Sequence, residues 1–261
     1  MLFFRLRIFL LSVFCFATIS GNVFKEAVFA NEEFFTHLNC VFYEMGFSYM
    51  CEVKNLLVTN ERTFINLVDG EHTEQRTEDN VVDLDVTNST TKYLPLNIFE
   101  VFENLRVLTV TNSSLEFIDK NTFYGGDHLK QLYLDHNNIV SFPIDTFYGL
   151  TELRYLSLSY NKITTLTSEH LVDLRSLFFF NMSNNKFNKL DNNLLKHNKQ
   201  LDWIYVDYGV LQLIKKKPWG YIEDLSWAIF EDNFCIGYKK LTSELDLTID
   251  KIGAFKCDAT N

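Results

Sequence analysis

Apolar residues recur through the middle of the chain at a fixed spacing of 24 residues. Five segments align without gaps and open with leucines at residues 105, 129, 153, 177 and 201. All five resemble the pattern L-x-x-L-x-L-x-x-N-x-L, with apolar residues at positions 1, 4 and 6. This alternation predicts a short strand with one buried face and one face in solvent. Such a strand cannot bury its apolar face alone, so the pattern predicts stacked coils that share one core and one parallel sheet.

The period and the pattern together are the signature of leucine-rich repeats. The same spacing places a first repeat at Val81 and an incomplete seventh repeat from Leu225 to Asn233. The sequence therefore predicts an α/β solenoid: a leucine-rich repeat horseshoe with a parallel concave sheet and about seven 24-residue repeats.

Position 9 of the repeat carries Asn137, Asn161 and Asn185. An asparagine there can bond the backbone of adjacent coils where the chain leaves the strand. Ser113 and Gly209 replace it elsewhere, so we expect this ladder of bonds to be weaker at both ends.

The segments outside the repeats are expected to be a signal peptide and two caps. Residues 1–20 place Arg5 and Arg7 before a short apolar run, which indicates a secretory signal peptide; a membrane anchor is the alternative. Residues 21–80 are expected to form an N-terminal cap, residues 81–233 the repeats and residues 234–261 a C-terminal cap. A hairpin is expected around Gly46. With no second apolar segment, the mature chain is expected to be secreted and extracellular, with no membrane span.

Four cysteines remain after removal of the signal peptide. An even number in a secreted chain predicts disulfides, and four cysteines allow three pairings. Local pairs at the two ends of the array favour Cys40–Cys51 and Cys235–Cys257, so that a disulfide closes each cap. Zinc is the rival interpretation, but no C-x2-C or paired histidine spacing supports it.

Charge and motifs argue against several classes of function. The 261 residues carry a net charge of −10, which disfavours binding to nucleic acid. No nucleophile, zinc-protease or phosphate-loop motif is present, and the six histidines are scattered. His136 beside Asp135 is not at a recognisable catalytic spacing, and His72 is expected to be structural. The sequence thus predicts no enzyme, no cofactor and no metal site.

The solvent-facing strand positions, 3 and 5, become aromatic towards the C-terminal repeats. Exposed aromatic residues in one patch are typical of binding hot spots. The alternative is that Trp203 and Trp227 fold under the C-terminal cap. Ser157, at position 5, is expected to face solvent and to tolerate alanine. With position 8 included, the expected partner-binding residues are Tyr133, Tyr155, Tyr160, Phe179, Trp203, Tyr205, Tyr208 and Trp227.

Three N-x-S/T sequons predict glycosylation at Asn88, Asn112 and Asn181 if the chain is secreted. Asn181 falls at position 5, in the middle of the sheet. A glycan there would crowd a partner that filled the whole face, which favours the C-terminal half as the binding surface.

The cap residues extend this pattern to nearly the whole mature chain. Cys40, Cys51, Gly70 and His72 precede the first repeat, and Asn233-Phe234-Cys235-Ile236 and Cys257 follow the last. In these features the chain resembles the secreted leucine-rich repeat proteins that are numerous in insects. The resemblance implies an extracellular recognition or scaffold protein, in some relatives tied to immunity or development.

Two functions are therefore expected. The first is a secreted, non-catalytic protein that binds another protein, or a glycan, through its concave sheet. The alternative is an extracellular structural or matrix protein that assembles through self-association. The sequence does not indicate an oligomeric state.

Overall fold

The computed structural model describes residues 33–73, 75–187, 191, 193–206 and 227–229. The predicted signal peptide, Gly209, Tyr208 and the C-terminal cap with its Cys235–Cys257 disulfide lie outside the described residues. Among the described residues, no helix is long and apolar enough to cross a bilayer.

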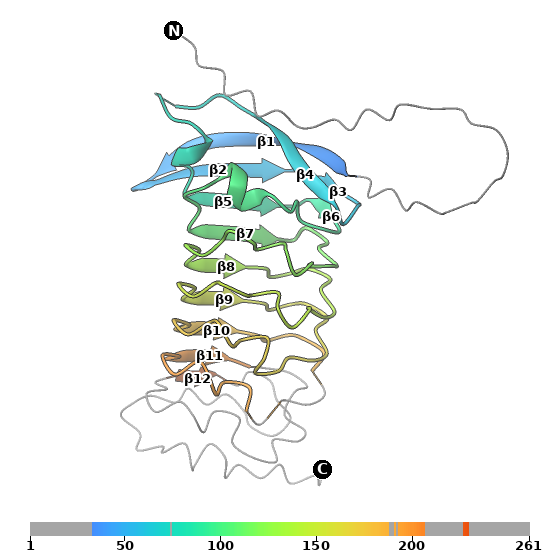
Figure 1. Cartoon of the computed structure of the whole chain (residues 1–261), viewed down its shortest axis with the longest axis vertical. Helices are drawn as coiled ribbons and strands as arrows, with labels where there is room; N and C mark the ends of the chain where they lie inside the picture. Colours follow the sequence, from blue (N-terminus) through green and yellow to red (C-terminus); the bar gives the residue numbers. More distant parts are fainter. Residues whose placement is uncertain (1–32, 74, 188–190, 192, 207–226, 230–261) are drawn as a thin grey trace, which may run out of the picture. The chain divides into compact units, whose positions relative to one another are not determined.

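One sheet of ten strands, in the order β12-β11-β10-β9-β8-β7-β5-β2-β1-β4, organises this part of the chain (Figure 1). Seven of its strands begin 24 residues apart, and each pairs in parallel with the next. These are β5 (Asp83–Thr87), β7 (Val107–Thr111), β8 (Gln131–Tyr133), β9 (Tyr155–Ser157), β10 (Phe179–Asn181), β11 (Trp203–Tyr205) and β12 (Trp227–Ile229). The predicted strand register and parallel pairing are confirmed.

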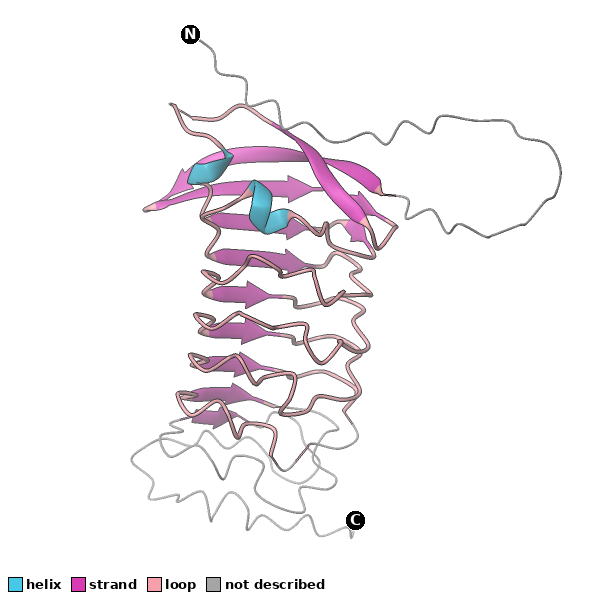
Figure 2. Cartoon of the chain, in the orientation of Figure 1, coloured by secondary structure: helices cyan, strands magenta, loops and turns pink. Residues whose placement is uncertain are grey.

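The return path of each coil contains little helix. The helices of the described residues are α1 (Ile98–Val101) and the 3-10 helix η1 (Glu78–Asn80), and turns close the other described coils (Figure 2). The α in the predicted α/β class is thus limited, in the described repeats, to α1. Buried aromatic side chains line this side: Phe123 stacks on Phe147 of the next coil, with ring centroids 5.9 Å apart.

The core lies between the sheet and these turns. Positions 4 and 6 of the repeats from Leu84 to Val206 are buried, for example Leu84, Leu156 and Leu158, each at most 1% exposed. Since each strand pairs only with its neighbours, the core is one continuous column of apolar side chains.

The position-9 side chains form the expected ladder. Each asparagine amide donates to a carbonyl 27 residues back, as Asn161 does to Leu134 at 2.8 Å, and accepts from a backbone N–H of the preceding coil. At the N-terminal end the ladder continues through serine, since Ser113 Oγ donates to the carbonyl of Val86 at 3.2 Å. At this end of the ladder a serine thus replaces the asparagine, and the hydrogen bonding between coils continues.

A hairpin closes the N-terminal end of the sheet. The predicted turn at Gly46, which has a positive φ of 64°, joins β1 (Phe34–Met45) to an antiparallel β2 (Ser48–Lys54). The disulfide between Cys40 and Cys51 links these two strands, as predicted. Strand β4 (Thr63–Asp69) lies parallel to the far edge of β1 and covers it. The short strands β3 (Leu57–Val58) and β6 (Thr90–Thr91) form a separate two-stranded sheet.

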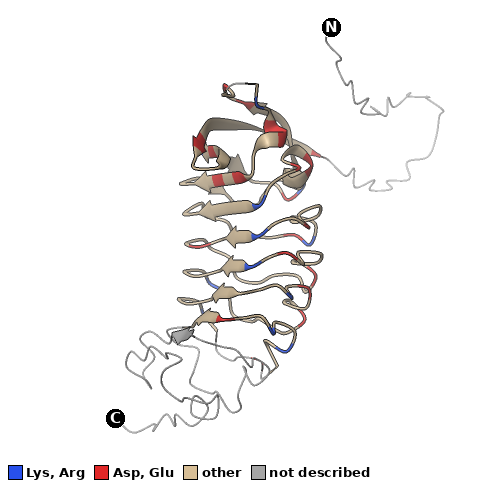
Figure 3. Ribbon diagram, turned by 90° about the vertical axis from the view of Figure 1, so that its left-hand side faces the viewer, with Lys and Arg blue, Asp and Glu red and all other residues tan. Residues whose placement is uncertain are grey.

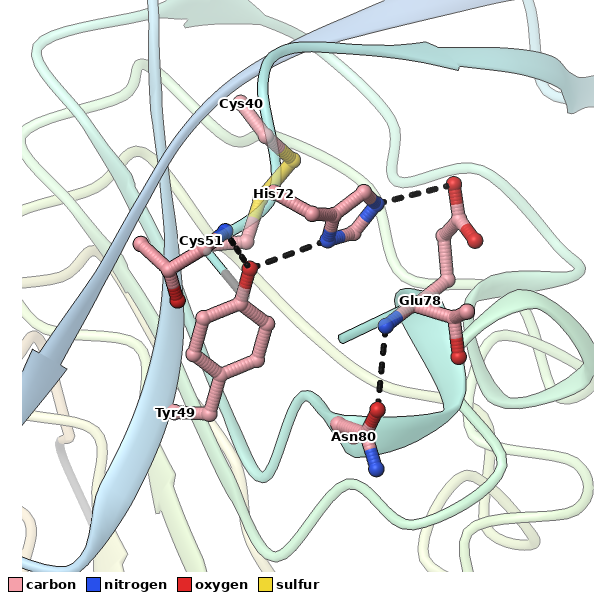
Figure 4. A network of polar contacts seen from close by, with 8 residues as sticks. Cys40, Tyr49, Cys51, His72, Glu78 and Asn80 are labelled. Atoms are coloured by element: carbon pink, nitrogen blue, oxygen red, sulfur yellow. Dashed lines mark hydrogen bonds and ion pairs between the residues drawn. A yellow bond between two sulfur atoms is a disulfide. The ribbon is translucent and has the colours of Figure 1, made fainter. Parts of the chain in front are cut away.

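His72 has a structural role in this cap, as expected. Its Nδ1 bonds the Tyr49 hydroxyl at 2.9 Å, and its Nε2 lies 3.3 Å from a carboxylate oxygen of Glu78 (Figure 4). The ring also stacks on Phe42 at 3.9 Å. Gly70 lets the chain pass close to β1 just before His72, because a Cβ at this residue would lie 2.3 Å from the Cys40 carbonyl oxygen and 2.9 Å from the Phe42 ring.

Candidate binding surface on the sheet

The outer face of the sheet, which we define as the face turned away from the core, carries positions 3 and 5 of each repeat. Tyr155, Phe179 and Trp203 lie in register on β9, β10 and β11. Trp227 pairs with Trp203, but its side chain is outside the described residues. The ring of Phe179 lies 6.0 Å from that of Tyr155 and 5.4 Å from that of Tyr205. We call Tyr155, Phe179, Trp203 and Tyr205 the aromatic row.

The side chains of the aromatic row are half-buried. Their strands are about 4.8 Å apart, and the ring of Phe179 is tilted by 32° relative to that of Tyr155 and by 43° relative to that of Tyr205. The row is therefore a half-buried aromatic surface that is held in place by its own ring contacts. Tyr160, at position 8, differs: it lies beyond the carboxyl end of β9 and is 50% exposed.

Ser157 contradicts one expectation. It is 4% exposed, and its hydroxyl donates to Oδ1 of Asp135 on the preceding coil. The same oxygen accepts from the backbone N–H and the hydroxyl of Ser159, at 3.0 and 2.6 Å. The serine side chain is short, so its neighbours cover it, and its hydroxyl can form a hydrogen bond with Asp135. The alternation of apolar and polar residues does not predict this burial.

Tyr133 continues the outer face towards the N-terminus. Its hydroxyl donates to Oε1 of Gln131 at 2.9 Å. Burial, followed by the nearby Tyr155 and Asp135, raises the pKa of its hydroxyl. At neutral pH it is thus a neutral hydrogen-bonding group beside the aromatic row.

Acidic residues are frequent at the N-terminal end of the sheet (Figure 3), and two of them stand on its outer face. Asp83 and Asp85 stand at positions 3 and 5 of β5, and Glu52 pairs with Asp85 in register. Burial and then the Asp85 charge raise the pKa of Asp83 to about 6. Burial, followed by Glu52, raises that of Asp85, whose Oδ1 is buried without a hydrogen-bond partner. Lys54, 2.9 Å from Glu52, offsets part of this charge.

The three sequon asparagines have different surroundings. Asn88 and Asn112 are exposed and adopt positive φ angles of 49° and 50°. Asn181 is half-buried, and its Oδ1 accepts from the backbone N–H and hydroxyl of Ser183, at 3.1 and 2.7 Å. Glycosylation of all three stays a prediction.

The described residues contain no group of three or more His, Cys, Asp or Glu side chains able to hold a metal ion. His136, the histidine beside Asp135, stacks on Tyr160 with ring centroids 4.1 Å apart and an interplanar angle of 10°. The sequence reasoning missed this stacked pair, although the 24-residue spacing puts the two side chains on neighbouring coils.

Comparisons with known proteins agree with this architecture. A model of the leucine rich repeat family matches residues 79–139 and 127–187. A chain of the LRIM1/APL1C complex is similar in structure, with a TM-score of 0.59 and 18% identity over 75% of this chain. This chain spans about a third, 34%, of the length of that protein. Internalin C2 from Listeria monocytogenes has a TM-score of 0.49 and 21% identity over 70% of this chain and 80% of its own.

A search of curated proteins finds no match. The repeat spacing, the parallel register, the asparagine ladder and the family match agree: residues 79–187 are leucine-rich repeats, and the chain has the leucine-rich repeat solenoid fold.

Proposed function

We propose that this protein is a secreted, non-catalytic binding protein that recognises another protein through the aromatic row on the outer face of its sheet. Solenoids of stacked repeats provide extended surfaces of this kind, and leucine-rich repeats generally serve protein–protein interaction. The observation that carries the proposal is the in-register arrangement of Tyr155, Phe179 and Trp203 beside Tyr205.

Several features support the choice of surface. Aromatic side chains give large contact area and lose little conformational entropy when a partner binds. The contacts of Phe179 with Tyr155 and Tyr205 hold the rings before binding. The acidic residues of β5 lie on the same face and favour a partner with basic groups beside an apolar patch.

Secretion is the second part of the proposal. It rests on Arg5 and Arg7 ahead of an apolar run, and on the Cys40–Cys51 disulfide, which an oxidising compartment maintains. The structural neighbour from the LRIM1/APL1C complex was solved as an assembly of proteins, which is in line with a binding role.

The test begins with identification of the partner. The full chain, fused to a labelling peroxidase, is expressed in the cells that produce it, and labelled extracellular proteins are identified. Retention of the fusion inside the cells contradicts secretion. The purified partner is then titrated against the wild type and against Phe179→Ala.

Phe179→Ala should weaken binding by about 2 kcal/mol, or about thirtyfold, because it removes the central ring of the row. Val107→Ala is the matched control, since Val107 is a half-buried residue at the same strand position on β7. Equal affinity of both variants for the partner would show that the aromatic row is not the recognition surface. Concentration-dependent oligomers with no partner would favour self-assembly instead.

A further inference from the structure

A groove lies beyond the carboxyl ends of the strands, apart from the aromatic row. It has a volume of about 830 Å³, and its lining includes Asn112, His136, Tyr160, Lys162, Asn184 and Lys186. Four of these residues, spaced 24 apart from 112 to 184, occupy position 8 of successive repeats. The groove therefore crosses four coils, roughly 15 Å at the spacing of neighbouring strands.

The backbone at position 8 is left-handed in every described repeat from Asn88 to Asn184, with φ between 49° and 55°. The backbone N–H of each of two central residues donates to a carbonyl of the next coil: His136 to Ser159 and Tyr160 to Ser183, both at 3.1 Å. The stacking of coils thus requires this conformation, whichever side chain is present. Asparagine tolerates it best among residues with a side chain, and asparagine occupies three of the five positions.

His136 and Tyr160 are the two exceptions. A tyrosine with positive φ costs free energy, and burial does not compensate at Tyr160, because its side chain is 50% exposed. Instead the two rings stack on each other, 4.1 Å apart and nearly parallel. An exposed tyrosine that is kept against its backbone preference and stacks on a histidine points to a role in binding and not in packing.

The charge of the groove differs from that of the chain. The protein has a net charge of −10, yet the described residues that line the groove include two lysines and no carboxylate. Among the described residues, no carboxylate lies within 4.0 Å of the ammonium group of Lys162 or Lys186. Asp135, the residue before His136, accepts hydrogen bonds from the hydroxyl groups of Ser157 and Ser159. Since the lysines stand on adjacent coils, about 4.8 Å apart at the strand spacing, both can reach one anionic group.

We propose that this groove binds an acidic oligosaccharide. The length across four coils suits a linear ligand, the aromatic pair offers a surface for the apolar face of a sugar ring, and the two lysines neutralise a carboxylate. Amide groups at the groove, such as that of Asn112, are suited to hydroxyl groups. The described lining supplies two cations, Lys162 and Lys186, which suits a ligand of low charge density and not a nucleic acid. This site is separate from the protein-binding surface proposed above and does not depend on it.

The test uses the full chain with Ser114→Ala, which removes the sequon of Asn112 and keeps its amide, so that no glycan covers the groove. A hyaluronan hexasaccharide, which carries carboxylates and no sulfate, is titrated by calorimetry beside neutral chitohexaose and hexathymidylate. We expect binding of hyaluronan alone, weakened at least tenfold by Tyr160→Asn and by Lys162→Gln combined with Lys186→Gln.

Tyr160→Asn is designed to separate binding from folding. It installs the residue that three other repeats carry at this position, so the melting temperature should stay the same or rise while binding is lost. Phe179→Ala, on the outer face, should leave saccharide binding unchanged. If chitohexaose binds as tightly as hyaluronan, the lysines do not recognise a carboxylate. If only hexathymidylate binds, the ligand of the groove is not a saccharide. No binding of hyaluronan, unchanged binding by Tyr160→Asn, or a large fall in its melting temperature would each overturn the site.

Discussion

The two halves of the sheet's outer face carry different side chains at identical strand positions. Strand β5 presents Asp83 and Asp85 where β10 presents Phe179 and Asn181. In the acidic half, burial and neighbouring carboxylates disfavour the charged form of both aspartates, as their raised pKa values show. The aromatic half is stabilised by its own ring contacts. Repeats thus fix where a side chain points and leave its chemistry free to vary.

Both halves rest on the same core, which a matched pair of substitutions can test. Leu84 and Leu156 occupy position 4 of β5 and β9 and are 1% and 0% exposed. Each change to alanine should lower the free energy of unfolding by about 2–5 kcal/mol, because it leaves a cavity in a packed core. Chemical denaturation measures both. A much smaller loss for Leu84→Ala would show that the acidic half lies on a looser core and that the comparison extends below the surface.

The acidic half adjoins a covalently closed end, which the aromatic half lacks among the described residues. Replacing Cys40 and Cys51 together by alanine should cost about 2–4 kcal/mol of stability, because the open hairpin gains chain entropy when unfolded. Denaturation measures the loss, and peptide mapping without reduction should first recover Cys40 joined to Cys51. An unchanged unfolding midpoint would mean that the hydrogen bonds of β1 and β2 suffice to close this end.

Ser157 tests whether the aromatic half is purely apolar. Ser157→Ala should cost about 1 kcal/mol, because it removes a buried hydrogen bond to the Asp135 carboxylate. Thr109→Ala is the control: Thr109 holds the same strand position on β7, and its hydroxyl forms no hydrogen bond among the described residues. Equal losses in thermal denaturation would mean that the bond contributes nothing and that alternation described this position well enough.

Asp83 makes the acidic half sensitive to pH. Its folded pKa of about 6 lies above the ordinary value of 3.8, so folding favours the protonated form. The contribution of Asp83 to stability should therefore be fully present below about pH 4 and be lost as pH rises through about 6. Asp83→Asn should remove this decline and add roughly 1 kcal/mol at pH 7, a figure reduced because solvent screens a half-buried charge.

The measurement is a set of melting curves from pH 4 to 7. Asp145→Asn is the control, because Asp145 is an exposed acid on the return side of its coil. A pH profile that keeps its slope in Asp83→Asn would show that another group titrates in this window.

Much of this fold follows from the sequence because contacts between coils repeat at the same spacing as the residues. The period predicted the seven strands from Asp83 to Trp227, and the position-9 asparagines predicted the ladder. Alternation, however, shows only which way a side chain points and not what a neighbouring coil places over it. It therefore missed the burial of Ser157, the half-burial of Phe179 and the stacking of His136 on Tyr160. The pairing of β4 with β1 joins segments outside the period and leaves no regular signal.

The asparagine ladder also bears on how such a protein changes over generations. Asn137, Asn161 and Asn185 donate to carbonyls 27 residues back at 2.7, 2.8 and 2.9 Å, so the junctions between these coils are nearly interchangeable. Duplication or loss of one 24-residue unit between them would recreate a junction already present in the chain. The array can therefore gain or lose one whole repeat at a time while the closed N-terminal end stays unchanged. Each such change also alters the number of surface positions available to a partner.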